Sequence, residues 1–260
     1  AVDLSLINPI TGRYMTGSSS GTAVNIFKGI NDIGVGTDGG GSVLAPALSL
    51  NLYAIISPFI MEEALRKHLK KSTDGIEFSP SIGLISKDFN TLENVLSFLM
   101  PPTDNDQSIN IKLMENNIEL HQPLLNEIDA QIKRDPTFSY DGLNRKLMID
   151  ELKKVNFDNT LLITTEGPID YLEYGDSVMG HYDTLTRSKQ KEGHKYYLKV
   201  VNMLNLSAIA VPSSYLSRGY LIIFKTDQNM LYHAIKLAKS IHYERSNLEK
   251  NYFQERRNHK

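Results

Sequence analysis

The sequence predicts an α/β protein in which helices and strands alternate along the chain. Segments with apolar residues at helical spacing alternate with short, continuous apolar runs that are typical of buried strands. The composition agrees with a packed fold, because 41% of the 260 residues are hydrophobic and 22% are charged. No internal repeat and no low-complexity linker divides the sequence, so we expect one domain over residues 1–260.

The first predicted elements are a helix, a strand and a second helix. Residues 22–30 form a mostly apolar segment that ends near a glycine, which predicts a short helix, and the apolar run 33–38 predicts a buried strand. Residues 57–71 predict a longer helix, because Pro58 suits its first turn and its basic residues gather at the far end, where they complement the helix dipole.

Two amphipathic segments come next. Residues 88–100 repeat leucine and valine at helical spacing, and Asn90 and Thr91 supply a capping signal near their start, so we expect a helix. Residues 111–134 form a second amphipathic stretch, which Pro123 interrupts.

The second half predicts the rest of the sheet and a closing helix. Its apolar runs predict three strands, its periodic segments predict two helices, and a polar segment predicts a surface loop. The strands are 160–165, 208–211 and 220–225, the helices are 195–206 and 228–252, and the loop is 177–193.

Charge and composition exclude several functional classes. The formal net charge is −2, which gives no electrostatic argument for a nucleic-acid or membrane partner. There is no cysteine, so thiol catalysis and thiolate metal sites are excluded, and the seven histidines show no metal-ligand spacing. There is no apolar run of the ~20 residues that a membrane-spanning helix needs, and no signal peptide precedes Ala1. We therefore expect a soluble, cytoplasmic protein without metal or cofactor.

One glycine pattern matches the dinucleotide-binding fingerprint. Residues 34–39 fit G-x-G-x-x-G after a predicted strand. The context does not fit, because Pro46 would interrupt the helix that should present its N-terminus to a pyrophosphate. The expected acidic residue is represented only by Glu62 and Glu63, which lie in a predicted amphipathic helix.

A second pattern matches the nucleophile elbow of α/β-hydrolases. Residues 17–21 fit G-x-S-x-G with Ser19 at the centre, and Asp183 and His233 are candidate partners. An elbow follows a buried strand, whereas the residues before Gly17 contain proline and glycine and predict a loop. This pattern is therefore a weak signal.

A third interpretation joins the two segments in one site. Residues 17–47 read GSSSGTAVNIFKGINDIGVGTDGGGSVLAPA, and residues 36–47 fit the pattern G-[TS]-D-x-G-G-S-[IV]-R-x-P-A at all but one fixed position. Ser18 and Ser42 are 24 residues apart, which is the separation of the two catalytic serines in the amidase signature family. On these residues the chain resembles that family, which implies a mixed central sheet flanked by helices.

Weaker blocks extend the resemblance toward the C-terminus. Residues 77–96, 158–168 and 201–212 are each similar to a family segment, and Asn202 and Pro212 stand at the expected places in the last of them. Three residues depart from the family pattern: Ser20 replaces a glycine, Leu44 replaces an arginine and Thr164 replaces a proline.

The resemblance assigns the catalytic roles to two serines. Ser42 is implied to be the nucleophile, and Ser18, held by a cis peptide bond, is implied to relay its proton to a neutral lysine. A hydroxyl is a weak nucleophile until a base removes its proton, and the same proton can then protonate the departing amine.

The glycines and two further residues have supporting roles in the same resemblance. The backbone N–H groups of Gly39, Gly40 and Gly41 are implied to form an oxyanion hole, which consecutive N–H groups can do where no Cβ intervenes. Asp38 and Ser19 are implied to support the site structurally, and the serine can also cap the following helix.

The lysine of the family is missing from the expected place. Only 17 residues precede Ser18, and none of them is lysine, while Lys28 lies in the helix between the two blocks, where it does not qualify. Two explanations remain open. Either an N-terminal segment or a second chain supplies the lysine, or the base has been lost.

We therefore carry three functional hypotheses. The first is an amidase that hydrolyses a small-molecule or peptide amide through a serine acyl-enzyme. The second is a non-catalytic, amidase-like binding or scaffold protein. The third is an amide-transfer subunit of a complex. The sequence does not identify the substrate, the oligomeric state or the role of residues 100–156.

Overall fold

The computed structural model describes residues 5–61, 63, 67–72, 75–104, 107–114, 130–134, 144–170, 184–185, 188 and 192–241. Within these residues the centre of the molecule is an eight-stranded sheet. Its strands are β1 (Ile33–Asp38), β2 (Tyr53–Ser57), β5 (Ser81–Ser86), β6 (Ile109–Leu113), β7 (Ala130–Arg134), β8 (Thr160–Glu166), β9 (Leu206–Pro212) and β10 (Gly219–Lys225).

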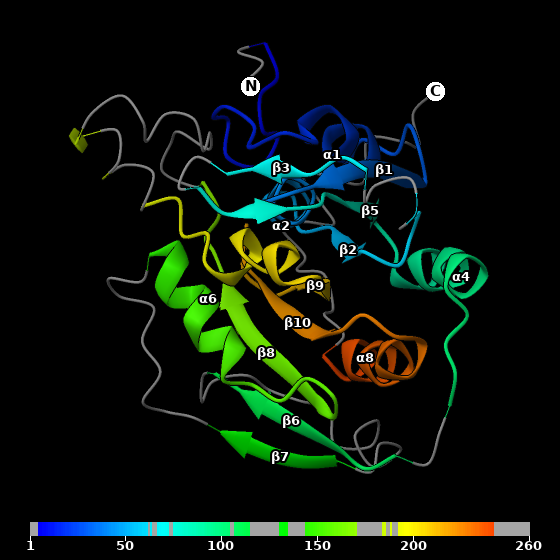
Figure 1. Cartoon of the computed structure of the whole chain (residues 1–260). Helices are drawn as coiled ribbons and strands as arrows, with labels where there is room; N and C mark the ends of the chain where they lie inside the picture. The colour runs from blue at the N-terminus through cyan, green and yellow to red at the C-terminus, as the bar shows by residue number, and fades with distance from the viewer. Residues whose placement is uncertain are drawn as a thin grey trace.

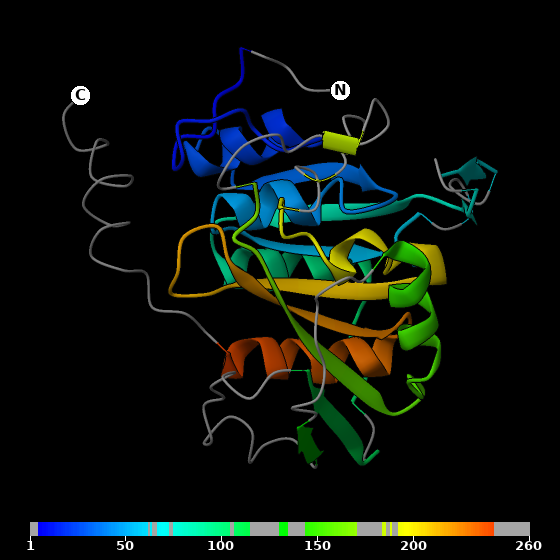
Figure 2. The ribbon, with the colours of Figure 1, turned by 90° about the vertical axis from the view of Figure 1, so that its left-hand side faces the viewer.

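The sheet is mixed, as the resemblance implies. The strand order is β1-β5-β2-β9-β10-β8-β6-β7, in which the neighbours from β1 to β8 are antiparallel and β6 is parallel to both β8 and β7. Figure 2 shows the sheet running from β1, beside the N-terminal residues, to β6 and β7 at the opposite end. A separate two-stranded ribbon pairs β3 (Lys70–Lys71) with β4 (Glu77–Phe78).

Helices cover both faces of this sheet. They are α1 (Ser20–Phe27), α2 (Leu44–Ser49), α4 (Phe89–Leu99), α6 (Arg145–Lys153) and α8 (Gln228–Ser240), with 3-10 helices η2 (Tyr197–Lys199) and η3 (Asn202–Leu204). The first core cluster contains side chains of α1, α2, α6 and η2, and the second contains those of α4 and α8. Figure 1 shows α6 and α8 on opposite sides of strands β8 and β10.

Burial on both faces explains why the central strands are continuous apolar runs. Every residue of β2 and β9 is buried, and so is every residue of β8 except Thr165. A strand that is covered on both sides has no solvent face, so it shows no alternation of apolar and polar residues. The predicted strands 160–165, 208–211 and 220–225 are confirmed within β8, β9 and β10. Segment 33–38 is a strand, β1, but it lies at the end of the strand order and Val35 is 60% exposed, so the expectation that it is buried is wrong.

Side-chain caps define where the long helices begin. Asp227 caps α8, because its Oδ1 accepts a hydrogen bond from the N–H of Met230 at 2.7 Å. At α4 the cap is Asp88, whose Oδ2 accepts from the N–H of Thr91 at 2.7 Å. Within the described residues, helices are present at the predicted segments 22–30, 88–100 and 228–252. The residue that caps the helix in 88–100 is Asp88 rather than Asn90.

Other expected elements are wrong or lie partly outside the described residues. The helix expected at 57–71 is wrong at both ends, because Ser57 closes β2 and Lys70 and Lys71 belong to β3. The described parts of 111–134 are strands. In place of one helix over 195–206 there are the two short 3-10 helices. Most of the loop expected at 177–193, and the part of 228–252 beyond residue 241, lie outside the described residues.

Two glycines that face each other bring the sheet and the predicted catalytic segments together. Gly36 of β1 is paired with Gly83 of β5. A Cβ on Gly36 would lie 2.5 Å from Oγ of Ser19, and a Cβ on Gly83 would lie 2.7 Å from Cγ1 of Val43. The absence of both side chains lets the start of α1 and the start of α2 pack on the same end of the sheet.

Among the described residues, no helix has both the length and the apolar character that crossing a membrane requires.

Candidate active site

The two predicted catalytic serines line the same cavity, which has a volume of about 280 Å³. Ser18 comes from the segment before α1, and Ser42 comes from the glycine loop between β1 and α2. Gly39, Gly40 and Gly41 of that loop also line the cavity. Residues that are distant in sequence are therefore brought to one place, with the glycine loop as one wall.

The serine segments are joined directly by a backbone hydrogen bond. The N–H of Ser19 donates to the carbonyl oxygen of Ser42 at 3.0 Å. The peptide bond between Gly17 and Ser18 is cis, as the resemblance implies. Ser19 itself is the N-cap residue of α1, but its side chain makes no capping hydrogen bond.

The carboxylate of Asp38 binds the backbone of the glycine loop. Its side chain is fully buried, and Oδ1 accepts the N–H of Gly41 at 2.7 Å while Oδ2 accepts the N–H groups of Val43 at 2.7 Å and Leu44 at 3.3 Å. Burial raises the pKa of Asp38, and the hydrogen bonds from Val43, Gly41 and Leu44 oppose that rise. One carboxylate thus fixes the backbone on both sides of Ser42.

The geometry of the loop divides the three glycines by role. Gly41 has φ of +95°, and a Cβ there would lie 2.4 Å from Leu198 Cδ1, so only glycine fits without strain. Its N–H is directed to Asp38, which takes it away from the cavity. Of the three predicted oxyanion donors, Gly39 and Gly40 are therefore the two that we expect to offer their N–H groups to a substrate.

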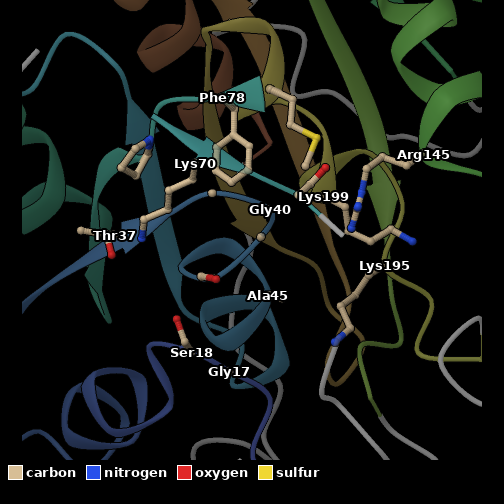
Figure 3. A pocket seen from close by; sticks show the side chains of 16 residues that line it. Gly17, Ser18, Thr37, Gly40, Ala45, Lys70, Phe78, Arg145, Lys195 and Lys199 are labelled. Carbon is tan, nitrogen blue, oxygen red and sulfur yellow. The ribbon is translucent and has the colours of Figure 1, made fainter. Parts of the chain in front are cut away.

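The wall opposite the serines is cationic, which sequence reasoning missed. Arg145, the first residue of α6, lines the cavity together with Lys195, which precedes η2, and Lys199, the last residue of η2. Figure 3 shows Ser18 and Gly40 on one side and these three side chains on the other. A signal for the two lysines was present, because they directly precede the block around Asn202 that carries part of the resemblance.

A buried carboxylate positions the lysine segment. Glu166 at the end of β8 is completely buried, and its oxygens accept the N–H of Tyr196 at 2.7 Å and of Leu198 at 3.1 Å. Burial raises the pKa of Glu166 to about 7, while the N–H donors of Tyr196 and Leu198 and the charge of Lys199 oppose the rise. The residues between the two lysines are thus anchored to the sheet.

Lys195 connects this segment to the first serine block. Its Nζ lies 2.8 Å from Oδ2 of Asp170 and 3.2 Å from Oγ1 of Thr16, two residues before Ser18. Asp170 and Thr16 are both buried. The ion pair therefore joins the C-terminal half of the site to the segment that presents Ser18.

The raised pKa of Glu166 predicts a specific pH dependence of stability. The folded protein holds the proton more tightly than the unfolded chain, whose glutamate has a pKa near 4.5, so the free energy of unfolding should fall as pH rises from about 4.5 to about 7. The contribution is on the order of 3 kcal/mol. Urea unfolding at several pH values should show a smaller slope in Glu166→Gln than in the wild type. Equal slopes would contradict this assignment, and Glu151→Gln, at a partly exposed position of α6, serves as the control.

The nucleophile-elbow alternative does not fit the arrangement. His233 is a buried residue of α8, and α8 packs in the core cluster on the face opposite the one that holds α1 and α2, away from Ser19. Its ring packs edge-on against Tyr232 with the centroids 5.3 Å apart. Asp183 lies outside the described residues.

The dinucleotide-binding alternative also fails on local structure. Gly34 and Gly36 lie inside β1, and the strand continues to Asp38. The helix that follows, α2, has six residues and contains Pro46. In the part of the chain that the structure describes, no group of three or more His, Cys, Asp or Glu side chains is placed to hold a metal ion.

Comparison with known proteins adds information at the level of fold. No protein-family model and no curated protein sequence matches the chain. The glutamyl-tRNA(Gln) amidotransferase subunit of known structure from Thermotoga maritima is similar with a TM-score of 0.54 at 17% identity, covering 92% of this chain and 66% of its own. A bacterial aryl acylamidase of the amidase signature enzymes family has a TM-score of 0.53 at 15% identity, covering 95% and 69%.

A third similar structure is the Kluyveromyces lactis urea amidolyase, with a TM-score of 0.52 at 15% identity over 94% of this chain and 18% of that protein. The chain thus spans about two thirds of the length of the first two proteins and less than a fifth of the third. Structural likeness at such low identity establishes a shared fold. The predicted fold class, a mixed central sheet flanked by helices of the amidase-signature type, is confirmed.

Proposed function

We propose that this chain, which has the fold of the amidase-signature enzymes, hydrolyses a carboxamide through an acyl-enzyme on Ser42. The observation that carries the proposal is the shared cavity, in which Ser18, Ser42 and a glycine loop held by Asp38 meet. The similar structures include an aryl acylamidase and a component of an amidotransferase, which supports amide chemistry for this fold.

The proposed reaction has two steps. Oγ of Ser42 attacks the carbonyl carbon of the amide and passes its proton to Ser18 and then to a base, while the N–H groups of Gly39 and Gly40 stabilise the negative oxygen. The carbon–nitrogen bond breaks, and the proton returns through Ser18 to the departing amine. Water then adds to the ester carbonyl and gives a proton to the base through Ser18. The bond to Ser42 breaks as that proton returns to Oγ of Ser42, and the carboxylic acid leaves.

The reaction also needs a base that accepts the proton from Ser18. Among the described residues, none that could act as a base is in hydrogen-bonding contact with Ser18. We propose that a lysine from a further segment or a second chain completes the site. Among the described strands β1 is at an edge of the sheet, and Gly36 of that strand packs against Ser19, next to Ser18. A strand added at this edge could bring a lysine to the serines. The similar amidotransferase protein is itself one subunit of an enzyme, which supports a partner chain.

A small substrate fits the cavity better than a long one. Its volume of about 280 Å³ lies at the lower end of the range for ligand pockets, about 300 to 1,000 Å³. We therefore propose that the substrate is a small-molecule amide rather than an extended peptide.

A fluorophosphonate probe tests this function. The probe phosphonylates an activated serine with loss of fluoride. The protein should be treated both as purified with any associated chain and as the isolated chain, with circular dichroism to confirm folding. We expect labelling of the protein purified with any associated chain. If both preparations are folded and neither is labelled, the hydrolase proposal fails and a non-catalytic binding role is favoured.

A further inference from the structure

The charged side chains that the structure describes as lining the cavity are all basic. Among the described residues that line it, the ionisable side chains are Lys70, Arg145, Lys195 and Lys199, and no aspartate or glutamate side chain lines it. The chain as a whole has a formal net charge of −2, so the positive charge is concentrated locally rather than being a general property of the protein.

Two carboxylates lie close to the cationic wall. Asp170 pairs with Lys195 at 2.8 Å. Glu166 directs its two oxygens to backbone N–H groups. Within the part of the chain that the structure describes, the ammonium of Lys199 has no ion pair, although its backbone is held by the anchored segment 195–199.

The surroundings of Lys199 also disfavour the protonated form of its side chain. Burial lowers its pKa to about 8; Glu166 opposes this shift, and the charges of Lys195 and Arg145 add to it. An anion that entered between Lys199 and Arg145 would relieve the repulsion between them and replace the water lost on burial. The positions therefore favour a negatively charged ligand group.

We propose, building on the hydrolase function above, that Lys199 and Arg145 bind a carboxylate of the substrate, so that the substrate is a short monoamide of a dicarboxylic acid. The amide carbonyl lies at the loop of Ser42, and the carboxylate lies at the cationic wall. Figure 3 shows the two parts of this arrangement facing each other across the cavity. Guanidinium and ammonium groups form charge-assisted hydrogen bonds with carboxylates, which fix orientation as well as affinity.

Binding to the Ser42→Ala variant tests the substrate class without turnover. Isothermal titration calorimetry should compare malonamate, succinamate and glutaramate with their neutral diamides, so that chain length is covered. We expect at least one of the anions to bind about tenfold or more tightly than its diamide. Equal binding of every anion and its diamide, or no binding of any of them, would overturn the proposal.

Lysine and arginine variants in the same background locate the anion. Lys199→Gln and Arg145→Gln should each reduce the preference for the anion about tenfold, whereas Lys199→Arg should retain most of it because it keeps the charge. Lys154→Gln, which changes an exposed lysine on the far end of α6, is the matched control. A preference that survives both Gln substitutions would overturn the assignment.

The pH dependence of binding supplies a second measurement. The protonated form of Lys199 binds the anion, and its pKa in the free protein is about 8, so affinity for the anion should be constant at lower pH and should fall above pH 8. Glu166, Asp170, Lys195 and Arg145 face the same ammonium and are unchanged in both proteins. The fall should be absent in Lys199→Arg, because arginine stays charged. A fall of equal size in that variant would contradict the role of Lys199.

The two proposals fail in different ways. A labelled Ser42 without preference for the anion overturns the carboxylate site and leaves hydrolysis intact. A preference for the anion that depends on Lys199, when the folded protein is unlabelled both with any associated chain and as the isolated chain, supports the carboxylate site and overturns the hydrolysis.

Discussion

Replacing Ser42 with alanine is expected to abolish probe labelling and to lower amide hydrolysis by at least about 10³-fold. The hydroxyl is the proposed site of bond formation, and no other serine occupies the same position on the glycine loop. The substitution removes one oxygen at a half-buried position and leaves the hydrogen bonds of Asp38 to Gly41 and Val43 in place, so folding should be retained.

A second serine of the cavity provides the control for this prediction. Ser72 lines the same cavity but lies next to β3, on another wall. Ser72→Ala should keep labelling and turnover close to the wild type. If Ser42→Ala retains labelling, or if Ser72→Ala loses it as completely, Ser42 is not the nucleophile.

Replacing Asp38 with alanine is expected to destabilise the protein by about 3 to 5 kcal/mol and to abolish labelling. The substitution leaves the buried N–H groups of Gly41, Val43 and Leu44 without their acceptor, and each unsatisfied buried donor costs about 1 to 3 kcal/mol. The loop that presents Ser42 then loses its support. Urea unfolding and probe labelling at a temperature where the variant is folded measure the two effects separately.

Two variants control this second prediction. Asp38→Asn keeps the shape but offers one acceptor oxygen, so it should retain one of the two 2.7 Å bonds and lose about half as much stability. Asp32→Ala changes an exposed aspartate just before β1 and should alter stability by less than about 0.5 kcal/mol. An Asp38→Ala variant as stable as Asp32→Ala would show that the carboxylate does not hold the loop.

Local sequence patterns predicted those elements whose structure is decided locally. The segments 33–38 and 160–165 each contain β-branched apolar residues over the length of a short strand, and both are present within β1 and β8. The helix expected at 88–100 has an acidic N-cap and an amphipathic repeat, which also act over short distances. For these segments the local preference and the tertiary structure agree.

The failures occur where pairing with another strand decides the outcome. Lys70 and Lys71 end a segment with helical charge patterning, yet they pair with Glu77 and Phe78 across a turn. The described part of 111–134 joins the sheet through β6 and β7, where β6 lies beside β8. Amphipathic spacing alone does not reveal such strand partners.

The residues of the candidate site likewise fall into those that the sequence predicted and those that it did not. The spacing of Ser18 and Ser42 and the glycines between them carried the resemblance, and the structure brings these residues to one cavity. Arg145 and Lys199 were missed because α6 and η2 reach the cavity only through packing on the sheet. Glu166 was missed as well, since a single acidic residue at the end of a strand gives no local sign of the backbone groups it binds.

Tandem mass spectrometry of the fluorophosphonate-treated protein gives the most direct test of the nucleophile. The folded protein should carry one phosphonyl group, and fragmentation should place it on Oγ of Ser42, within the glycine loop that follows β1. An adduct on Ser18, Ser19 or Ser72, or the absence of any adduct on the folded protein purified with any associated chain, would contradict the proposed acyl-enzyme on Ser42.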